Sequence, residues 1–86
     1  INPQAPIHVL VIPKGPYVSM DDFTKSASDD EITSFFKAVG STARQLGLSP
    51  LGYRMIANIG QNGMQEVPHL HVHIMGGKKM GPMVVR

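Results

Sequence analysis

The sequence predicts a single α+β domain, in which an antiparallel β-sheet is covered by one main amphipathic helix. Three observations support this prediction. A capped helical stripe of apolar residues fills the middle of the chain, short apolar runs rich in β-branched residues lie on both sides of it, and residues 69–73 alternate strictly between histidine and apolar residues. The chain has 86 residues, so residues 1–86 are expected to form one small domain.

Composition excludes several classes of function. The chain has no cysteine, and therefore neither a disulfide nor a thiolate metal site. Its formal net charge is +2, with the basic residues scattered along the chain, so no nucleic-acid partner is expected. No apolar run approaches the ~20 residues of a spanning helix, and the start of the chain does not resemble a signal peptide. We expect a cytoplasmic protein with no membrane partner.

The first expected element is a strand at residues 7–12, because a nearly continuous apolar run lies between Pro6 and Pro13. Such a run is typical of a strand that is covered on both faces. His8 interrupts it, and the residues alone favour a buried, hydrogen-bonded histidine there. Residues 14–27 are expected to be a loop with a short helical turn around residues 20–25.

A longer helix is expected next. Ser28 and Glu31 have the spacing of a capping box, and Gly47 occupies the position of a left-handed C-terminal cap, with Leu48 available to pack back. Between these ends, apolar residues recur at helical spacing, so one face should pack on the core. They are Ile32, Phe35, Phe36, Val39, Ala43 and Leu46.

Two further strands are expected at residues 53–59 and 66–75, joined by a tight turn at residues 60–63. Together they would form a β-hairpin, which brings Asn58 beside the histidines of the last strand. In an extended strand, side chains alternate between faces, so His69, His71 and His73 should project from one side. The intervening apolar residues should then anchor the strand in the core.

Three uses of such a histidine face compete: a solvent-facing strand surface, a metal site, or nucleophilic and acid/base catalysis. Three alternate residues on one strand span about 13 Å, too far for all of them to reach one zinc ion at about 2.0–2.1 Å. The sequence offers no cysteine as a fourth ligand, and the nearest acidic residue is Glu66. Catalysis without a metal or another cofactor is the favoured interpretation.

Residues 65–77, Gln-Glu-Val-Pro-His-Leu-His-Val-His-Ile-Met-Gly-Gly, resemble the signature of the histidine triad (HIT) family. The glutamine before the histidines and the Gly-Gly after them resemble the nucleotide-binding phosphoramidase branch. Residues 3–14 and 52–58 are similar to two other blocks of that branch, and residues 81–83 are similar to bacterial members. The likeness therefore extends over most of the chain.

This resemblance implies a hydrolase of nucleoside 5′-phosphoramidates or related nucleotidyl conjugates, active as a homodimer on a purine nucleotide. His71 would be the nucleophile and form a nucleotidyl-histidine intermediate. His73 would contact the phosphate and orient His71, and His69 would assist protonation of the leaving group. The expected substrate-binding positions are Asn58, Gln65, the backbone of Glu66 and Val67, His8, and the apolar residues Leu10 and Ile1.

Two other functions remain open from the sequence: a dinucleoside polyphosphate hydrolase, which also keeps three histidines, and a non-catalytic nucleotide-binding regulatory protein. The third histidine argues against the nucleotidyltransferase branch, which resembles this motif but has glutamine there. Family members usually carry a helix and a hairpin before the position of Ile1, so an N-terminally incomplete domain is expected. Two residues depart from the pattern: Met64 replaces a common glycine, and Pro68 replaces a common aromatic residue.

Overall fold

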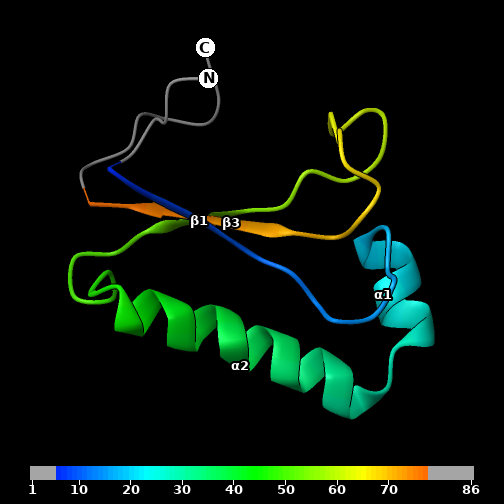
Figure 1. The fold of residues 1–86 in the computed structure, drawn as a ribbon, viewed down its shortest axis with the longest axis horizontal. Helices are drawn as coiled ribbons and strands as arrows, with labels where there is room; N and C mark the ends of the chain where they lie inside the picture. The colour runs from blue at the N-terminus through cyan, green and yellow to red at the C-terminus, as the bar shows by residue number, and fades with distance from the viewer. Residues whose placement is uncertain (1–5, 78–86) are drawn as a thin grey trace.

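A three-stranded antiparallel sheet carries the histidines in the computed structural model, which describes residues 6–77. The strand order is β1–β3–β2, with β1 at Ile7–Val11, β2 at Arg54–Ile56 and β3 at Val72–Gly76. Two helices, α1 at Met20–Ser26 and α2 at Asp29–Gln45, connect β1 to β2. The predicted α+β class with one main helix is confirmed (Figure 1).

The core lies between the sheet and α2, which runs along one face of the sheet (Figure 1). Alternate residues of the histidine segment, Leu70, Val72 and Ile74, are at most 2% exposed on this face. The helical stripe supplies Phe35, Val39 and Ala43 from the other side, and Phe23 of α1 completes an edge-to-face aromatic contact with Phe35. One member of the predicted stripe, Phe36, is instead 40% exposed.

Both ends of α2 have the predicted caps. The Ser28 hydroxyl accepts a hydrogen bond from the Glu31 amide, and the Glu31 carboxylate accepts one from the Ser28 amide. Gly47 has φ +73°, the left-handed conformation that glycine adopts without the strain of a side chain. Leu48 then packs back into the core, so the chain reverses sharply toward β2.

The predicted short helical turn is confirmed as α1, but it has a second capping box that the sequence analysis missed. Ser19 is its N-cap, and Asp22 occupies the third helical position. The backbone N–H groups of Val18 and Ser19 donate to the Asp22 carboxylate, and these hydrogen bonds lower the pKa of Asp22 to about 2. The acidic pair at residues 21 and 22 therefore lies in the first turn of this helix.

The predicted strands are longer than the observed ones. β2 has three residues instead of seven, and β3 begins only at Val72 instead of at residue 66. Pro68 has no N–H to donate, and the Leu70 N–H donates to the Tyr17 carbonyl rather than to a neighbouring strand. Residues 66–71 are thus tied to the segment before α1, and the sheet ladder starts after them.

The expectation that residues 7–12 are covered on both faces is wrong for the described part of the chain. Val9 packs partly against the core, but His8 is exposed, and Leu10 and Ile12 are 56% and 58% exposed. The exposed side chains of β1 therefore lie on the face of the sheet that α2 does not cover. In residues 6–77, no helix combines the length and the apolar composition needed to span a membrane.

Candidate active site

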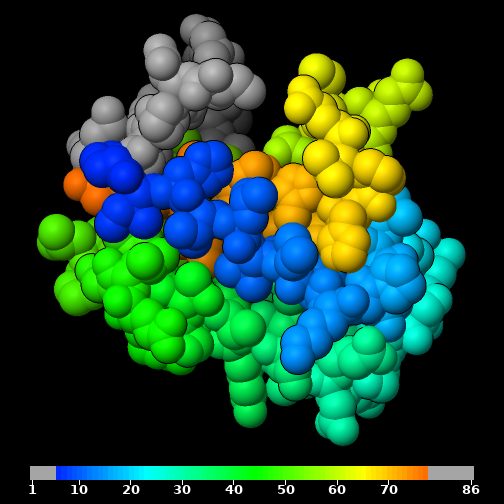
Figure 2. Space-filling view, in the orientation of Figure 1, coloured from blue at the N-terminus to red at the C-terminus, as the bar shows by residue number. Residues whose placement is uncertain are grey.

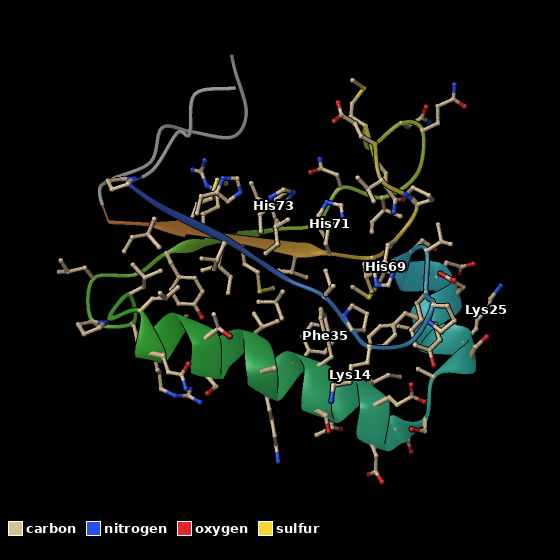
Figure 3. All side chains as sticks on the ribbon, in the orientation of Figure 1. Lys14, Lys25, Phe35, His69, His71 and His73 are labelled. Atoms are coloured by element: carbon tan, nitrogen blue, oxygen red, sulfur yellow. The ribbon has the colours of Figure 1, made fainter. Side chains whose placement is uncertain are left out.

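His71 and His73 project from the sheet face opposite α2, while the residues between them point into the core (Figure 3). His69 lies just before them, where the chain enters the sheet. All three histidines are partly exposed. The strand alternation that the sequence predicts therefore places the imidazoles of His71 and His73 on one accessible surface, with an apolar anchor beneath them.

The backbone fixes the tautomer of His71. Its Nδ1 lies 2.8 Å from the carbonyl oxygen of His69, and a carbonyl oxygen can only accept a hydrogen bond. Nδ1 must therefore carry the proton, so a neutral His71 has its free lone pair on Nε2. The result is an oriented imidazole with an unprotonated nitrogen on the open face of the sheet.

His73 lies between two other histidines. Its Nδ1 is 2.8 Å from Nε2 of His8, and its ring centroid is 5.0 Å from that of His71. Burial, followed by the charges that His71 and His8 can carry, lowers the pKa of His73 below its usual value. The arrangement favours a neutral His73, whose single shared proton joins it to His8.

His69 is held by the segment that follows β1. Its Nε2 is 3.2 Å from the carbonyl oxygen of Pro13, so this nitrogen is the donor. The next residue is fixed in the same way, because the Leu70 N–H donates to the Tyr17 carbonyl over 2.8 Å. The position of His69 therefore depends on residues 13–17 rather than on the sheet ladder.

The register of the sheet surrounds His73 with apolar side chains. Leu10 of β1 and Ile56 of β2 are its two partners across the strands, so all three share one face. Leu10 is largely exposed, and it offers an uncovered apolar surface beside the imidazoles. Ile1, the other apolar position that the resemblance implies, lies outside the described residues.

The two predicted amide residues lie in the loop between β2 and β3, which rises beside the strands (Figure 2, yellow). The Asn58 side chain donates to the Gly63 carbonyl over 2.9 Å. Gln65 makes three hydrogen bonds, all to backbone groups. The Asn58 carboxamide therefore contacts the loop itself, whereas the Gln65 carboxamide contacts both the loop and Val18 in the segment before α1.

The predicted phosphate-contacting positions, Glu66 and Val67, are exposed at the end of this loop. Within residues 6–77, their backbone N–H groups have no hydrogen-bond partner in the protein. Two adjacent free N–H groups that precede a histidine cluster are suited to an anionic oxygen. The side chains of these two residues need not take part in such a contact.

The backbone carbonyls of Pro13 and His69 are parts of the site that the sequence analysis missed. Each orients one histidine, yet any residue type can supply a carbonyl, so the sequence carries no signal for it. Among residues 6–77, no group of three histidine, aspartate or glutamate side chains is arranged to hold a metal ion.

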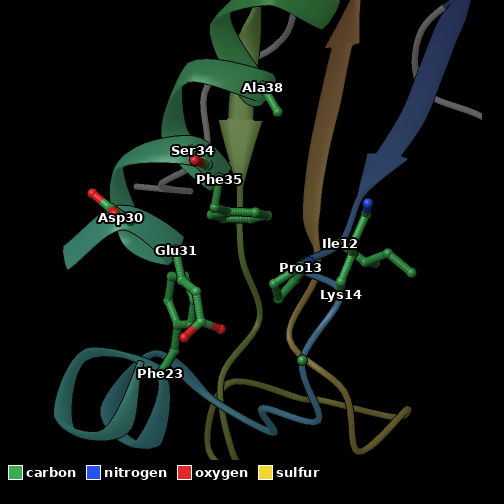
Figure 4. Close-up of a pocket in the computed structure, with 10 residues that line it drawn as sticks. Ile12, Pro13, Lys14, Phe23, Asp30, Glu31, Ser34, Phe35 and Ala38 are labelled. Atoms are coloured by element: carbon green, nitrogen blue, oxygen red, sulfur yellow. The ribbon is translucent and has the colours of Figure 1, made fainter. Parts of the chain in front are cut away.

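A hollow of about 400 Å³ lies between residues 12–15 and the first half of α2, away from the histidine face (Figure 4). Phe23 and Phe35 form its apolar wall, and Lys14, Asp30 and Glu31 are its charged residues. Glu31 is already occupied by the Ser28 cap and by the Tyr17 hydroxyl. No histidine lines this hollow, so we place the candidate active site on the opposite face.

Comparison with known proteins identifies the family of the chain. The profile of the HIT domain matches residues 1–80. A HIT-like protein from the hisE 3′ region of Azospirillum brasilense is 54% identical over 86 residues, covering 100% of this chain and 70% of the relative. A purine nucleoside phosphoramidase of Escherichia coli K12 is 36% identical over 84 residues, covering 98% of this chain and 70% of that protein.

Solved structures show the same likeness. A histidine triad protein from Clostridium difficile superposes with a TM-score of 0.79 at 38% identity, covering 98% of this chain and 72% of that one. A HIT family hydrolase from Legionella pneumophila superposes with a TM-score of 0.77 at 36% identity, covering 92% of this chain and 70% of that one.

Proposed function

Because this chain belongs to the HIT domain family, we propose that it hydrolyses nucleoside 5′-phosphoramidates or related nucleotidyl conjugates through a nucleotidyl-histidine intermediate. The relative from E. coli, a purine nucleoside phosphoramidase, supports this substrate class. The observation that carries the proposal is the orientation of His71. Its Nδ1–H is bound to the His69 carbonyl, so its Nε2 is a neutral nucleophile that needs no separate base.

The proposed reaction has two displacements at phosphorus. In the first, Nε2 of His71 forms a bond to phosphorus while the bond from phosphorus to the leaving nitrogen or oxygen breaks. The leaving atom takes a proton, which His69 supplies from the neighbouring position. In the second, water attacks phosphorus, the bond to His71 breaks, and the nucleoside monophosphate departs. The proton from water restores the starting protonation of the site.

The surrounding groups have complementary roles in this proposal. The free N–H groups of Glu66 and Val67 bind phosphate oxygens, and the charge that develops there is stabilised by dipoles already in place. His73, kept neutral by burial and by its neighbours, contacts the phosphate and packs edge-on against the His71 ring. The exposed side chain of Leu10 packs against the nucleoside.

We further propose that the protein acts as a homodimer in the cytoplasm. α2 and the β2 edge carry exposed apolar side chains, Phe36 at 40% and Met55 at 52%, which a second copy could cover. Neither the net charge of +2 nor its distribution favours a nucleic-acid partner.

Replacement of the nucleophile tests the mechanism. His71→Ala should abolish turnover of an adenosine 5′-phosphoramidate, because it removes the nitrogen that would form the covalent intermediate. Binding of adenosine monophosphate should stay within roughly tenfold, about 1.4 kcal/mol. Rapid base-quench mass spectrometry of the wild-type protein, which preserves the acid-labile bond from phosphorus to histidine, should find the nucleotidyl group on the peptide that contains His71. Near-normal turnover by the variant would refute the mechanism.

The same assay separates the alternatives. A dinucleoside polyphosphate hydrolase would cleave diadenosine polyphosphates with a higher kcat/KM than the phosphoramidate. A non-catalytic nucleotide-binding protein would bind the monophosphate equally well with or without the His71 imidazole and would turn over neither substrate. Measuring both substrates and the binding constant on one preparation distinguishes the three functions.

A further inference from the structure

We infer that Gln65 is a positioning residue, which holds the loop before the histidines in the conformation that binds phosphate and does not itself contact the substrate. This inference rests on the proposed function. It differs from the role that the family resemblance implies for Gln65, which is substrate binding. It follows from the three hydrogen bonds that the carboxamide makes inside the protein.

The carboxamide has no donor left for a phosphate. Its Nε2 donates to the Val18 carbonyl over 2.6 Å and to the Val67 carbonyl over 3.1 Å, which uses both N–H bonds. Its Oε1 accepts from the Gly60 N–H over 2.8 Å. The remaining capacity is one lone pair on oxygen, which would repel an anionic phosphate oxygen rather than bind it.

The three partners of the carboxamide lie on separate parts of the chain. Gly60 begins the loop, Val67 ends it, and Val18 belongs to the segment before α1. The backbone of Gln65 strengthens the same closure, since its N–H donates to the Gly60 carbonyl over 2.9 Å. One side chain thus joins both ends of the loop and attaches the loop to the body of the protein.

The loop needs this support because its conformation is strained. Met64, next to Gln65, has φ +62°, a left-handed conformation that costs a non-glycine residue about 1–2 kcal/mol. The two free N–H groups of Glu66 and Val67 follow directly, and their direction is set by the same backbone. When the carboxamide is lost, the loop can relax and the N–H groups turn away from the phosphate.

The Gln65 contact is one of three that join residues 13–18 to residues 65–70. The others are the bond from His69 to the Pro13 carbonyl and the bond from Leu70 to the Tyr17 carbonyl. Loss of the Gln65 contact should therefore also loosen residues 13–18, the segment that fixes the position of His69. The nucleophile, His71, is oriented by a local carbonyl and should be less affected.

The test compares Gln65→Ala with Gln61→Ala in the full chain. Gln61 is an exposed glutamine in the same loop, and its side chain makes no hydrogen bond within the described residues. We expect Gln65→Ala to accelerate amide hydrogen exchange at Gly60 and Gln65 in the ligand-free protein. It should also weaken adenosine monophosphate binding by roughly tenfold. The pH profile of kcat should keep its shape, and Gln61→Ala should match the wild type in every measurement.

Two results would overturn the inference. If binding weakens while loop exchange is unchanged, the side chain contacts the substrate directly. If the loop opens while binding and KM stay at the wild-type values, the loop conformation does not matter to the site. Gln65→Met preserves the length of the side chain without its hydrogen bonds, and it replaces the alanine variant if that variant fails to fold.

A failure of the proposed function is recognised separately. If the wild-type protein turns over no nucleotide substrate but still binds adenosine monophosphate, the exchange and binding measurements continue to test the role of Gln65. If the wild-type protein neither binds nor turns over a nucleotide, no phosphate site exists for Gln65 to position, and the inference falls with it.

Discussion

His73 is surrounded by groups that disfavour its protonation. Burial and the charges of His71 and His8 lower its pKa in the folded state, whereas in the unfolded chain it should titrate near 6.5. Between these two values the unfolded state binds more protons than the folded state, so stability rises with pH. The contribution of His73 to the free energy of unfolding is fully present above about pH 6.5, the pKa in the unfolded chain. It is lost as the pH falls through the lower pKa of the folded state.

This difference predicts a pH-dependent melting temperature. The wild-type protein should lose stability as the pH falls below about 6.5, and His73→Asn should lose less, because the titrating group is gone. Thermal unfolding of both proteins in buffers of equal ionic strength measures the effect. Parallel curves for the two proteins would show that His73 has the same pKa in the folded and unfolded states.

The backbone conformation of Met64 gives a second prediction for a single residue. Its left-handed backbone is strained, and glycine would relieve that strain. Glycine also makes the unfolded chain more flexible, which lowers the free energy of unfolding by about 0.5–1 kcal/mol. Met64→Gly should therefore stabilise the protein by roughly 0.5 kcal/mol in denaturant titrations. Gly60→Ala is the opposite test, because Gly60 has φ +66° and alanine should destabilise the fold there. A destabilised Met64→Gly protein would contradict this account.

Single residues also show where sequence reasoning stops. The alternation at residues 69–73 was enough to place His71 and His73 on the sheet face opposite α2, because strand geometry determines it there, whereas His69 is positioned by its bond to the Pro13 carbonyl. It could not show that the Gln65 carboxamide binds Val18, which is 47 positions away. Such contacts depend on the folded arrangement of distant segments, and the identity of a glutamine is compatible with a substrate contact as well as with a backbone contact.

Among the elements, α2 depends most clearly on local chemistry. Its capping box satisfies an orphan N–H at the first turn and places a carboxylate near the positive end of the helix dipole. Ser28→Ala should therefore lower the free energy of unfolding by about 1 kcal/mol in urea titrations. Ser41→Ala, in the helix interior, should be neutral or slightly stabilising, because alanine favours helix there. Equal effects of the two changes would argue against the cap.

The difference between local and long-range interactions explains which elements the sequence predicted well. Both caps and the apolar stripe of α2 lie within one continuous segment, and the prediction of that helix is confirmed. The strands were predicted too long, because their ends are set by competing partners. Leu70, for example, donates to Tyr17 instead of joining a ladder, and the segment from residue 66 to 71 leaves the sheet. The alternation of apolar residues contains no information about that competition.

For the whole molecule, the exposed apolar side chains predict a dimer. The mass in solution should be twice the 9.3 kDa of the chain when light scattering is measured at micromolar concentration. Phe36→Asp should shift the protein to the monomer, because a charge cannot be buried without a partner. Ser34→Asp is the matched control, since Ser34 is exposed on the opposite flank of α2. A monomeric wild-type protein with full activity would refute the dimer.

The pairing of β1 with β3 has a consequence for how the protein folds. Val11 meets Val72 and Ile7 meets Gly76, so the sheet joins segments from nearly opposite ends of the described chain. Bringing these two segments together has a large entropic cost, and the stabilising contacts between β1 and β3 form only afterwards. By contrast, α2 and its caps can form within one continuous segment. The bond between His8 and His73 requires this late closure. A partly folded chain that retains its helices therefore lacks the histidine cluster, and the recovery of nucleotide binding during refolding should report completion of the sheet.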